Sequence, residues 1–318
     1  MKSEPFASGK VILRRGPNYR STLATLTLLV VLLAGVGQWA SAQETPTRRP
    51  DRAVPAKPFQ IIGNIYYVGQ IDNSKPGSDD ASYLITTSEG HILLDSGEEG
   101  TVPQIRDNVQ KLGFRLGDVK LLIHSHAHSD HVAGDALIKE LSPGIQLLAM
   151  EGDHEVITTG GKADFNPERE NYKPARVDRV LKDGEQIRLG GTTLVAHKTA
   201  GHTKGCTTWT TTIDDGGQKR NVVFLCSARF TAGLPLVNNA RYPNIAKDFL
   251  DTFRTLKSLQ PDVFLASHGF FYGMVEKFKR MEQGAKPNPF IDPAGYKAYI
   301  AQAEKDFLAE LRKQGGTP

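Results

Sequence analysis

From Phe59 onward, apolar residues occur in short runs rich in β-branched and aromatic side chains, and turn-forming residues separate these runs. Gly63-Asn64 and Glu89-Gly90 are pairs of this kind, and such pairs favour tight turns between neighbouring strands. The pattern therefore predicts four short strands at the beginning of the folded region. They cover residues 60–62, 65–68, 82–86 and 91–95.

Beyond residue 100 the pattern changes to an alternation of strands with amphipathic helices. We expect helices over 103–112 and 132–138, and strands over 119–123 and 147–149. The segment 160–176 is polar and contains proline, so we expect a surface excursion there.

The second half of the chain repeats the strand-rich pattern. Apolar runs at 186–189 and 193–196 flank Gly190-Gly191, which is the sequence signature of a β-hairpin. A further strand is expected over 262–266, and a long amphipathic helix over 294–312 closes the chain. Strands combined with helices in both halves predict an α/β fold.

The first 42 residues differ in composition from the rest. Five basic residues stand within the first 20 positions, the apolar run 23–36 follows, and Ala40-Ser41-Ala42 completes the segment. Together these features indicate a secretory signal peptide over 1–42, cleaved after Ala42, and hence a periplasmic protein. A membrane anchor is the alternative, but the apolar run is near the lower limit of about 18 residues for a membrane span.

Removal of this signal changes the charge balance. The chain has 39 basic and 35 acidic residues, and the signal holds five of the former and one of the latter, which leaves 34 of each. Composition therefore gives no support for a face that binds nucleic acid. We expect a flexible leader over 43–58, rich in Pro, Thr and Arg, and a single domain over 59–318.

The clearest chemical signal is the segment His124-Ser125-His126-Ala127-His128-Ser129-Asp130-His131, which directly follows a predicted strand. Imidazoles and a carboxylate are the ligand types that suit zinc. His126 and His128 alternate, so on an extended backbone their rings point to the same side. Asp130 and His131 stand where the chain turns into a helix and their side chains diverge. One segment can therefore supply ligands to two metal ions.

Three further candidates stand at the ends of predicted strands. His202 and His268 would each be an ordinary polar loop residue if taken alone. Because strand ends in an α/β sandwich gather at one rim, both can instead converge on the histidine-rich segment. Asp95 could cap the helix that follows it or could orient a metal ligand from the outer shell. We expect His124 to brace the segment through a hydrogen bond.

These residues resemble the metallo-β-lactamase superfamily. The resemblance rests on His126-x-His128-x-Asp130-His131, on Gly201-His202 and on Ser267-His268-Gly269, and it extends from about Phe59 to the C-terminal helix. Within the superfamily, three flanking segments resemble subclass B3. They are residues 191–194, 201–209 and 288–290.

One position separates the possible activities. In most hydrolases of this superfamily, a strand of the form Val-Phe-x-x-Asp supplies a carboxylate that bridges both metals, and here Ser227 stands at that place. Two β-lactamase subclasses use a cysteine ligand in this region, but Cys226 is one residue away and faces the other side of the strand. The resemblance therefore favours subclass B3 over a glyoxalase II-like thioesterase, a lactonase or a phosphodiesterase.

The resemblance implies an αββα sandwich of two similar halves, with the site at one rim and two Zn²⁺ per chain. It implies a hydrolase that opens the β-lactam ring of antibiotics, a small-molecule substrate and no stable membrane anchor. The alternative is a dizinc hydrolase of the same fold that acts on another ester, lactone or thioester. The implied ligands are His126, His128 and His202 for one zinc, and Asp130, His131 and His268 for the other.

The implied reaction needs no protein nucleophile. A water shared by two zinc ions has its pKa lowered from 15.7 towards roughly 7, and the resulting hydroxide attacks the lactam carbonyl. Asp130 can orient this hydroxide while it ligates one metal.

The expected substrate contacts are less regular. In subclass B3 relatives, two hydroxyls spaced two residues apart help to hold the substrate carboxylate, and the corresponding residues here are Ser227 and Arg229. An arginine would make a charge-assisted contact, unless it turned to solvent or paired with a nearby acid. Where some members carry a tyrosine that assists the oxyanion, this chain has Leu234. Asn238 and Asn239 are weak alternative donors.

The chain has two cysteines, each in or next to a predicted strand, and Asp215-Gly216-Gly217 joins the two strands. Pairing residue 212 with residue 220 about this three-residue loop places Cys206 directly opposite Cys226. Opposite residues on antiparallel strands lie within disulfide range, and export places the chain in an oxidising compartment. We therefore expect a disulfide, with two buried thiols as the alternative.

Overall fold

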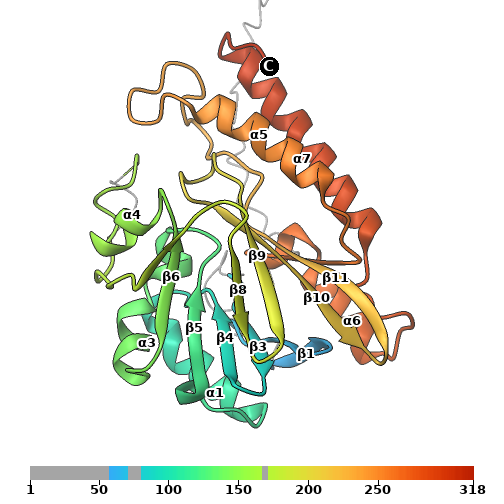
Figure 1. Cartoon of the computed structure of the whole chain (residues 1–318). Coiled ribbons are helices and arrows are strands. Elements are labelled where there is room, and N and C mark those ends of the chain that lie inside the picture. The colour runs from blue at the N-terminus through green and yellow to red at the C-terminus, as the bar shows by residue number, and fades with distance from the viewer. Residues whose placement is uncertain (1–56, 71–79, 167–170) are drawn as a thin grey trace, which may run out of the picture. The chain divides into compact units, whose positions relative to one another are not determined.

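The computed structural model describes residues 57–70, 80–166 and 171–318. The expected signal peptide and nearly all of the expected leader lie outside these ranges, so both stay predictions. Two β-sheets form the centre of the described domain, and helices lie outside them (Figure 1). Within the three ranges, no helix combines the length and the apolar character needed to cross a membrane.

The first sheet has seven strands, and their order in the sheet follows their order in the chain. Strands β1 to β4 are antiparallel, whereas β4 to β7 run parallel. Both faces of this sheet are covered, so β4 and β5 have nearly continuous apolar runs in place of alternation. The strands are β1 Phe59–Ile62, β2 Ile65–Tyr67, β3 Tyr83–Thr87, β4 Gly90–Leu94, β5 Val119–Ile123, β6 Gln146–Met150 and β7 Arg179–Leu181.

The second sheet has five strands in the order β12-β11-β10-β9-β8. Strands β8 to β11 form an antiparallel meander, and β12 joins the edge parallel to β11. The strands are β8 Gln186–Leu189, β9 Thr192–Lys198, β10 Thr207–Asp215, β11 Gln218–Leu225 and β12 Val263–Ala266.

Helices cover the outer face of each sheet. The apolar side chains of α1, α3 and α4 form one buried cluster with those of β4, β5 and β6. Those of α5 and α7, which lie side by side in Figure 1, belong to the cluster that contains the second sheet. The helices are α1 Val102–Lys111, α2 Ser129–Val132, α3 Asp135–Leu141, α4 His154–Thr158, α5 Ile245–Ser258, α6 Met274–Glu282 and α7 Pro293–Lys313.

The main core lies between the two sheets. Tyr83 of β3 contacts Phe224 of β11 edge-to-face at 5.1 Å between ring centroids, and Trp209 of β10 is fully buried in the same cluster. Full burial of a large apolar side chain contributes about 1.5–3 kcal/mol to stability. The layers are therefore helix, sheet, sheet and helix, and the predicted αββα sandwich is confirmed.

Two hairpins turn on consecutive glycines. Gly190-Gly191 closes the β8–β9 hairpin as predicted, because Leu189 pairs with Thr192 and both glycines have positive φ. Gly216-Gly217, with φ of 63° and 90°, forms a loop of the same two-residue type between β10 and β11. Two left-handed residues suit this kind of turn because its twist matches that of the strands.

The predicted register of the β10–β11 hairpin was therefore wrong by one residue. Asp215 is not in the loop but pairs with Gln218, and Thr212 pairs with Asn221 and not with Arg220. The two glycines provide the tight turn by themselves, so the strands continue one residue further than expected.

The predicted helix 132–138 is two helices. Helix α2 ends at Val132, and α3 begins at Asp135 after a break at Ala133-Gly134. A Cβ on Gly134 would lie 2.6 Å from the Ser96 carbonyl oxygen, so only glycine allows this approach to the loop after β4.

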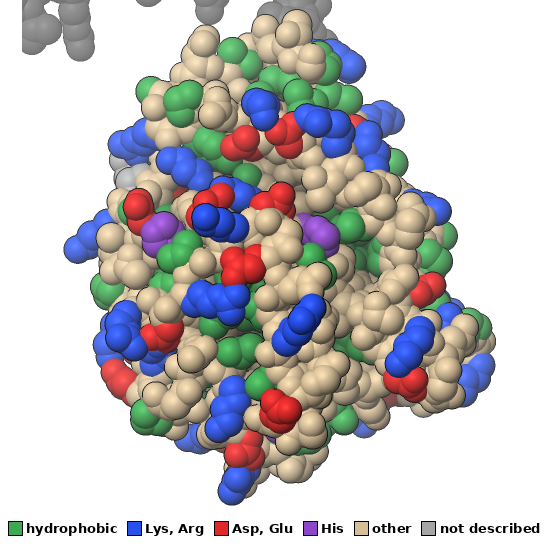
Figure 2. All heavy atoms as spheres, in the orientation of Figure 1, with side chains coloured by type: hydrophobic (Ala, Val, Ile, Leu, Met, Phe, Trp, Pro, Cys, Tyr) green, Lys and Arg blue, Asp and Glu red, His purple; other side chains and the backbone are tan. Residues whose placement is uncertain are grey.

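Charged side chains on the face shown in Figure 2 are mixed. Lys and Arg alternate there with Asp and Glu, and neither sign forms a continuous patch. This mixture agrees with the equal numbers of basic and acidic residues after the expected signal.

Candidate metal centre

The histidine-rich segment, His202 and His268 lie together beyond the carboxyl ends of three strands. His126 and His128 follow β5, His202 follows β9, and His268 comes two residues after the end of β12. These strands end at the same rim of the sandwich. His126 and His268, which are 142 positions apart in the chain, therefore lie in one site. The convergence expected from the sequence is therefore found.

The first group of donor atoms consists of His126, His128 and His202, whose ligand atoms lie within 4.8 Å of one another. His126 Nε2 is 3.1 Å from His128 Nδ1. The His202 ring lies 4.7 Å from the His126 ring and 4.8 Å from the His128 ring, measured between centroids. Three imidazoles thus point their nitrogen atoms at one position.

The second group consists of Asp130, His131 and His268, together with Asp80. His131 Nε2 is 3.3 Å from His268 Nε2, and Asp130 Oδ2 is 3.4 Å and 3.8 Å from these two nitrogens. The rings of His126 and His131 are 4.1 Å apart, so the two groups adjoin.

The residues present fit two divalent ions such as zinc. Burial, with His131 and His202 nearby, holds the pKa of His126 well below its usual value, and burial lowers the pKa of His202 to about 4. Both imidazoles are therefore neutral at pH 7 and keep a lone pair for a metal, as ligation requires. Each group offers at least three donors of types that zinc accepts.

Asp95 holds His131 from behind. Its Oδ2 is 3.0 Å from His131 Nδ1 and accepts from Ser125 Oγ at 2.7 Å, while its Oδ1 accepts from Ser125 N at 2.7 Å. Burial opposes its charge, but His131 and His124 outweigh burial and lower the pKa of Asp95 to about 2. The helices that follow β4 have Glu98 and Thr101 as their N-caps, so Asp95 caps neither of them. Its outer-shell role stays a prediction, which its contact with His131 supports.

The backbone of Asp95 is also unusual, with φ of 63°. A non-glycine residue in this region costs on the order of 1–3 kcal/mol and persists only where its surroundings impose it. The three hydrogen bonds of its carboxylate supply that constraint.

The brace expected from His124 stays a prediction, but its ring lies between two carboxylates. Its Nε2 lies 3.1 Å from Asp135 Oδ2, its Nδ1 lies 3.7 Å from Asp95 Oδ1, and its carbonyl accepts from Trp209 Nε1 at 2.9 Å. Burial alone would lower the pKa of His124, but Asp135 and Asp95 raise it to about 9. At neutral pH His124 is thus a buried cation between two carboxylates.

Two site residues were missed from the sequence, and the first is Asp153. Its carboxylate accepts from Ala127 N at 3.0 Å, Thr203 Oγ1 at 2.7 Å and Gly205 N at 2.7 Å. It therefore fastens the loop of His126 and His128 to the loop of His202. Asp153 follows β6, so its place just beyond a strand end at the same rim was an available signal.

The second missed residue is Asp80, whose Oδ1 lies 3.1 Å from His268 Nδ1. Asp80 precedes β3, which is antiparallel to β4, so the start of β3 and not its end reaches the rim. A rule based on the ends of strands alone therefore does not predict Asp80.

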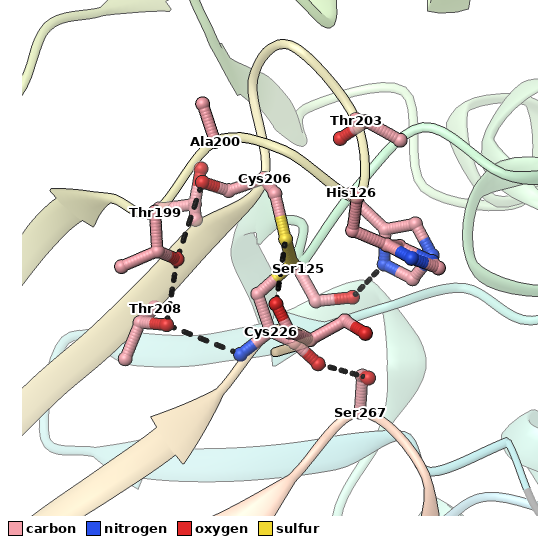
Figure 3. The surroundings of a disulfide bond; sticks show 12 residues. Ser125, His126, Thr199, Ala200, Thr203, Cys206, Thr208, Cys226 and Ser267 are labelled. Atoms are coloured by element: carbon pink, nitrogen blue, oxygen red, sulfur yellow. Dashed lines mark hydrogen bonds between the residues drawn. A yellow bond between two sulfur atoms is a disulfide. The ribbon is translucent and has the colours of Figure 1, made fainter. Parts of the chain in front are cut away.

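Cys206 and Cys226 form a disulfide with a Cα–Cα distance of 6.0 Å, as expected. The β10–β11 pairing stops at Trp209 and Phe224, so the cysteines lie past it and the shifted register does not separate them. Figure 3 shows Ser125 and His126 on one side of the disulfide. Cys226 O accepts from Ser267 Oγ at 2.5 Å, next to His268.

Ser227 and Arg229 lie on the chain that continues from Cys226. Ser227 is buried and its Oγ accepts from Arg229 N at 3.3 Å, so its hydroxyl supports the loop.

Arg229 is exposed, and its guanidinium lies 5.6 Å from the centre of the Phe270 ring. The Phe270 ring is itself 5.5 Å from the His268 ring. The Arg229 carbonyl lies 2.8 Å from His202 Nδ1. Arg229 therefore stands at the rim of both donor groups.

The loop beyond Arg229 borders a cavity of about 370 Å³ lined in part by Leu234. The Asn239 side chain donates to Pro235 O and accepts from the backbone of Tyr242, so it serves its own loop. The segment 160–176 is not wholly a surface excursion, because Tyr172 Oη donates to Ala127 O at 2.9 Å.

Comparison with known proteins gives the following relatives. Residues 79–268 match the metallo-beta-lactamase superfamily. The native FEZ-1 metallo-beta-lactamase from Legionella gormanii is 43% identical with a TM-score of 0.78, over 83% of this chain and 99% of that chain. BJP-1, a subclass B3 metallo-beta-lactamase of Bradyrhizobium japonicum, is 40% identical with a TM-score of 0.75, over 84% and 97%.

A curated relative carries another activity. The human mitochondrial persulfide dioxygenase ETHE1 is 28% identical over 137 residues, which are 42% of this chain and 44% of that protein. The chain thus matches less than half the length of this relative, whereas it covers nearly all of the two lactamases.

Proposed function

Because the chain belongs to the metallo-beta-lactamase superfamily, we propose that it is a zinc-dependent hydrolase that opens the β-lactam ring. The observation that carries this proposal is the pair of adjoining donor groups without a bridging carboxylate. Ser227 stands where many hydrolases of the superfamily place that acid, and it is buried with its hydroxyl on the Arg229 backbone. The similarity to FEZ-1 and BJP-1 over most of their length supports the same reading.

The residues are proposed to hold two zinc ions. His126, His128 and His202 hold one, and Asp130, His131 and His268 hold the other. When bound, such ions supply Lewis acidity, which lowers the pKa of a bound water and polarises a carbonyl.

Asp130 is the one proposed catalytic side chain. Its side chain is 33% exposed, whereas that of His131 beside it is fully buried. Asp130 can therefore ligate on one side and still reach the open side, where its carboxylate orients the attacking water. The chain requires no serine or cysteine nucleophile, and both cysteines are in the disulfide.

Arg229 is proposed to hold the substrate carboxylate. Its guanidinium is exposed and packs over Phe270, next to the second donor group. A guanidinium can donate two parallel hydrogen bonds to a carboxylate, and this contact is stronger than that of a hydroxyl. Ser227 is proposed to act with it by fixing the backbone of the Arg229 loop.

We also propose export to the periplasm as a single domain over 59–318 after cleavage of residues 1–42. The basic, apolar and small-residue parts of that segment support this, and so does the disulfide, which persists in oxidising compartments.

The test is hydrolysis of a chromogenic cephalosporin and a carbapenem by the purified mature chain, before and after treatment with a chelator. We expect activity that the chelator removes and that zinc restores, and loss of most activity in His128→Ala. Hydrolysis of simple lactones or thioesters with no activity on either lactam would replace the proposal by the alternative dizinc hydrolase.

A further inference from the structure

The two donor groups differ in what lies behind their histidines. In the first group, His126 Nδ1 is 3.1 Å from Ser125 Oγ and His202 Nδ1 is 2.8 Å from the Arg229 carbonyl. Both partners are uncharged. A ring nitrogen that faces a hydroxyl or a carbonyl fixes the orientation of the imidazole but adds no negative charge to the site.

In the second group, both histidines have a carboxylate behind them. His131 Nδ1 is 3.0 Å from Asp95 Oδ2, and His268 Nδ1 is 3.1 Å from Asp80 Oδ1. Asp95 and Asp80 are only 1% and 6% exposed, so water screens their charges weakly. With Asp130 as a direct donor, the second group combines three carboxylates, whereas the partners of His126 and His202 in the first group are uncharged.

The position of Asp80 is set by the backbone. Asp80 and His268 form an antiparallel β-bridge, and Ala81 N donates to Ser267 O at 2.8 Å. Two residues further, Tyr83 Oη donates to Ala266 O at 2.7 Å. The segment before β3 therefore runs alongside the end of β12, and it presents the Asp80 carboxylate to the edge of the His268 ring that faces away from His131.

We propose that Asp80 is a positioning residue that makes the Asp130, His131 and His268 group the tighter of the two zinc sites. This inference rests on one part of the proposed function, namely that both groups bind zinc. Asp80 acts through the Nδ1 edge of His268, where it orients the ring and increases the basicity of Nε2. Outer-shell partners of this kind typically change metal affinity by about 10–100-fold when they are removed.

The experiment uses the full mature chain, stripped of metal and titrated with zinc in competition with a chromogenic chelator. Wild type should bind two ions with separate dissociation constants. His268→Ala should remove the tighter ion, and His202→Ala should remove the weaker one. Asp80→Asn keeps the shape of the side chain and loses its charge, so it should raise the lower dissociation constant about 10–100-fold and leave the other within about twofold.

Asp164 offers a matched control. It is as buried as Asp80, at 6% exposure, and its carboxylate accepts from Asn166 N. Asp164→Asn should leave both dissociation constants unchanged.

A purely structural role for Asp80 gives a different result. It would lower the melting temperature of the metal-free protein and weaken both sites together, whereas we expect the metal-free melting temperature of Asp80→Asn to match or exceed that of wild type.

Equal affinities in wild type, or an unchanged tighter site in Asp80→Asn, would overturn the inference. Absence of any zinc binding would overturn both this inference and the proposed function. Unequal sites without lactam hydrolysis would support the inference and remove only the proposed lactamase activity.

Discussion

Removal of the disulfide should cost this protein about 3 kcal/mol of stability. Cys206 and Cys226 are fully buried and lie 20 residues apart in the chain. In the chain-entropy description, a cross-link lowers the entropy of the unfolded chain by about 2.1 + 1.5R ln n cal/mol/K, where n is the number of residues in the closed loop. For this loop the lost entropy corresponds to about 3 kcal/mol of stability at 25 °C. The change to test is Cys206→Ala with Cys226→Ala, which removes the cross-link without adding a buried polar group.

The effect should reach one donor group more than the other. Cys206 O accepts from Thr199 N at 2.8 Å, so the cysteine closes the base of the loop that carries His202. Across the disulfide, the chain runs through Ser227 to Arg229, whose carbonyl faces His202 Nδ1. Without the cross-link, these two segments can separate. We therefore expect weaker zinc binding by the His126, His128 and His202 group and little change in the other.

The assay is urea unfolding of the metal-free protein. The free energy of unfolding should fall by about 3 kcal/mol for each mole per litre of urea. The double variant should therefore unfold at a urea concentration about 1 M lower than wild type. A reducing agent should move wild type to the midpoint of the variant and leave the variant unchanged, which makes the variant its own control. An unshifted midpoint, or two free thiols in denatured and unreduced wild type, would refute the reasoning.

Three other predictions follow from the site. Arg229→Ala should raise KM about tenfold or more for carboxylate-bearing β-lactams with zinc content intact, since charge-assisted contacts are worth about 1.5–3 kcal/mol, and unchanged kinetics would assign the carboxylate to other residues. His268→Ala should reduce bound zinc from two ions to one and remove most turnover, so full turnover with one ion would exclude a two-zinc reaction. Burial raises the pKa of Asp153 to about 6 from 3.8, so its contribution to stability is complete below pH 3.8 and is lost as pH rises through 6. The stability of wild type relative to Asp153→Asn should therefore fall by about 2 kcal/mol between pH 4 and pH 7, and a difference independent of pH would contradict this.

The donor set could be predicted from the sequence because its signals are local. The spacing of His126, His128, Asp130 and His131 is a property of six consecutive residues, and it persists whatever the rest of the chain does. His202 and His268 could be added because one topological rule, that strand ends share a rim, brings distant residues together. Neither step requires knowledge of packing.

The outer residues depend on packing, and so the sequence did not show them. Asp153 is important only because three donors from two loops reach it, and Asp80 only because an antiparallel strand begins beside the end of β12. The hairpin register failed for a similar reason. Whether Thr212 pairs with Arg220 or with Asn221 depends on whether the loop has three residues or two. The sequence Asp215-Gly216-Gly217 is compatible with both loop lengths.

The buried charges give a reason why metal binding and folding should be one process here. Asp95 and Asp80 lie behind the ligands, in surroundings where an uncompensated carboxylate is costly. Within the described residues, the buried cation His124 lies between Asp95 and Asp135, away from Asp80 and Asp130. Cations at the two donor groups would supply the charge that the chain itself does not. A ligand that binds only the folded state stabilises it by RT ln(1 + [L]/Kd), about 2.7 kcal/mol at a hundredfold excess over Kd. Zinc should accordingly stabilise the folded chain most through the group richest in carboxylates.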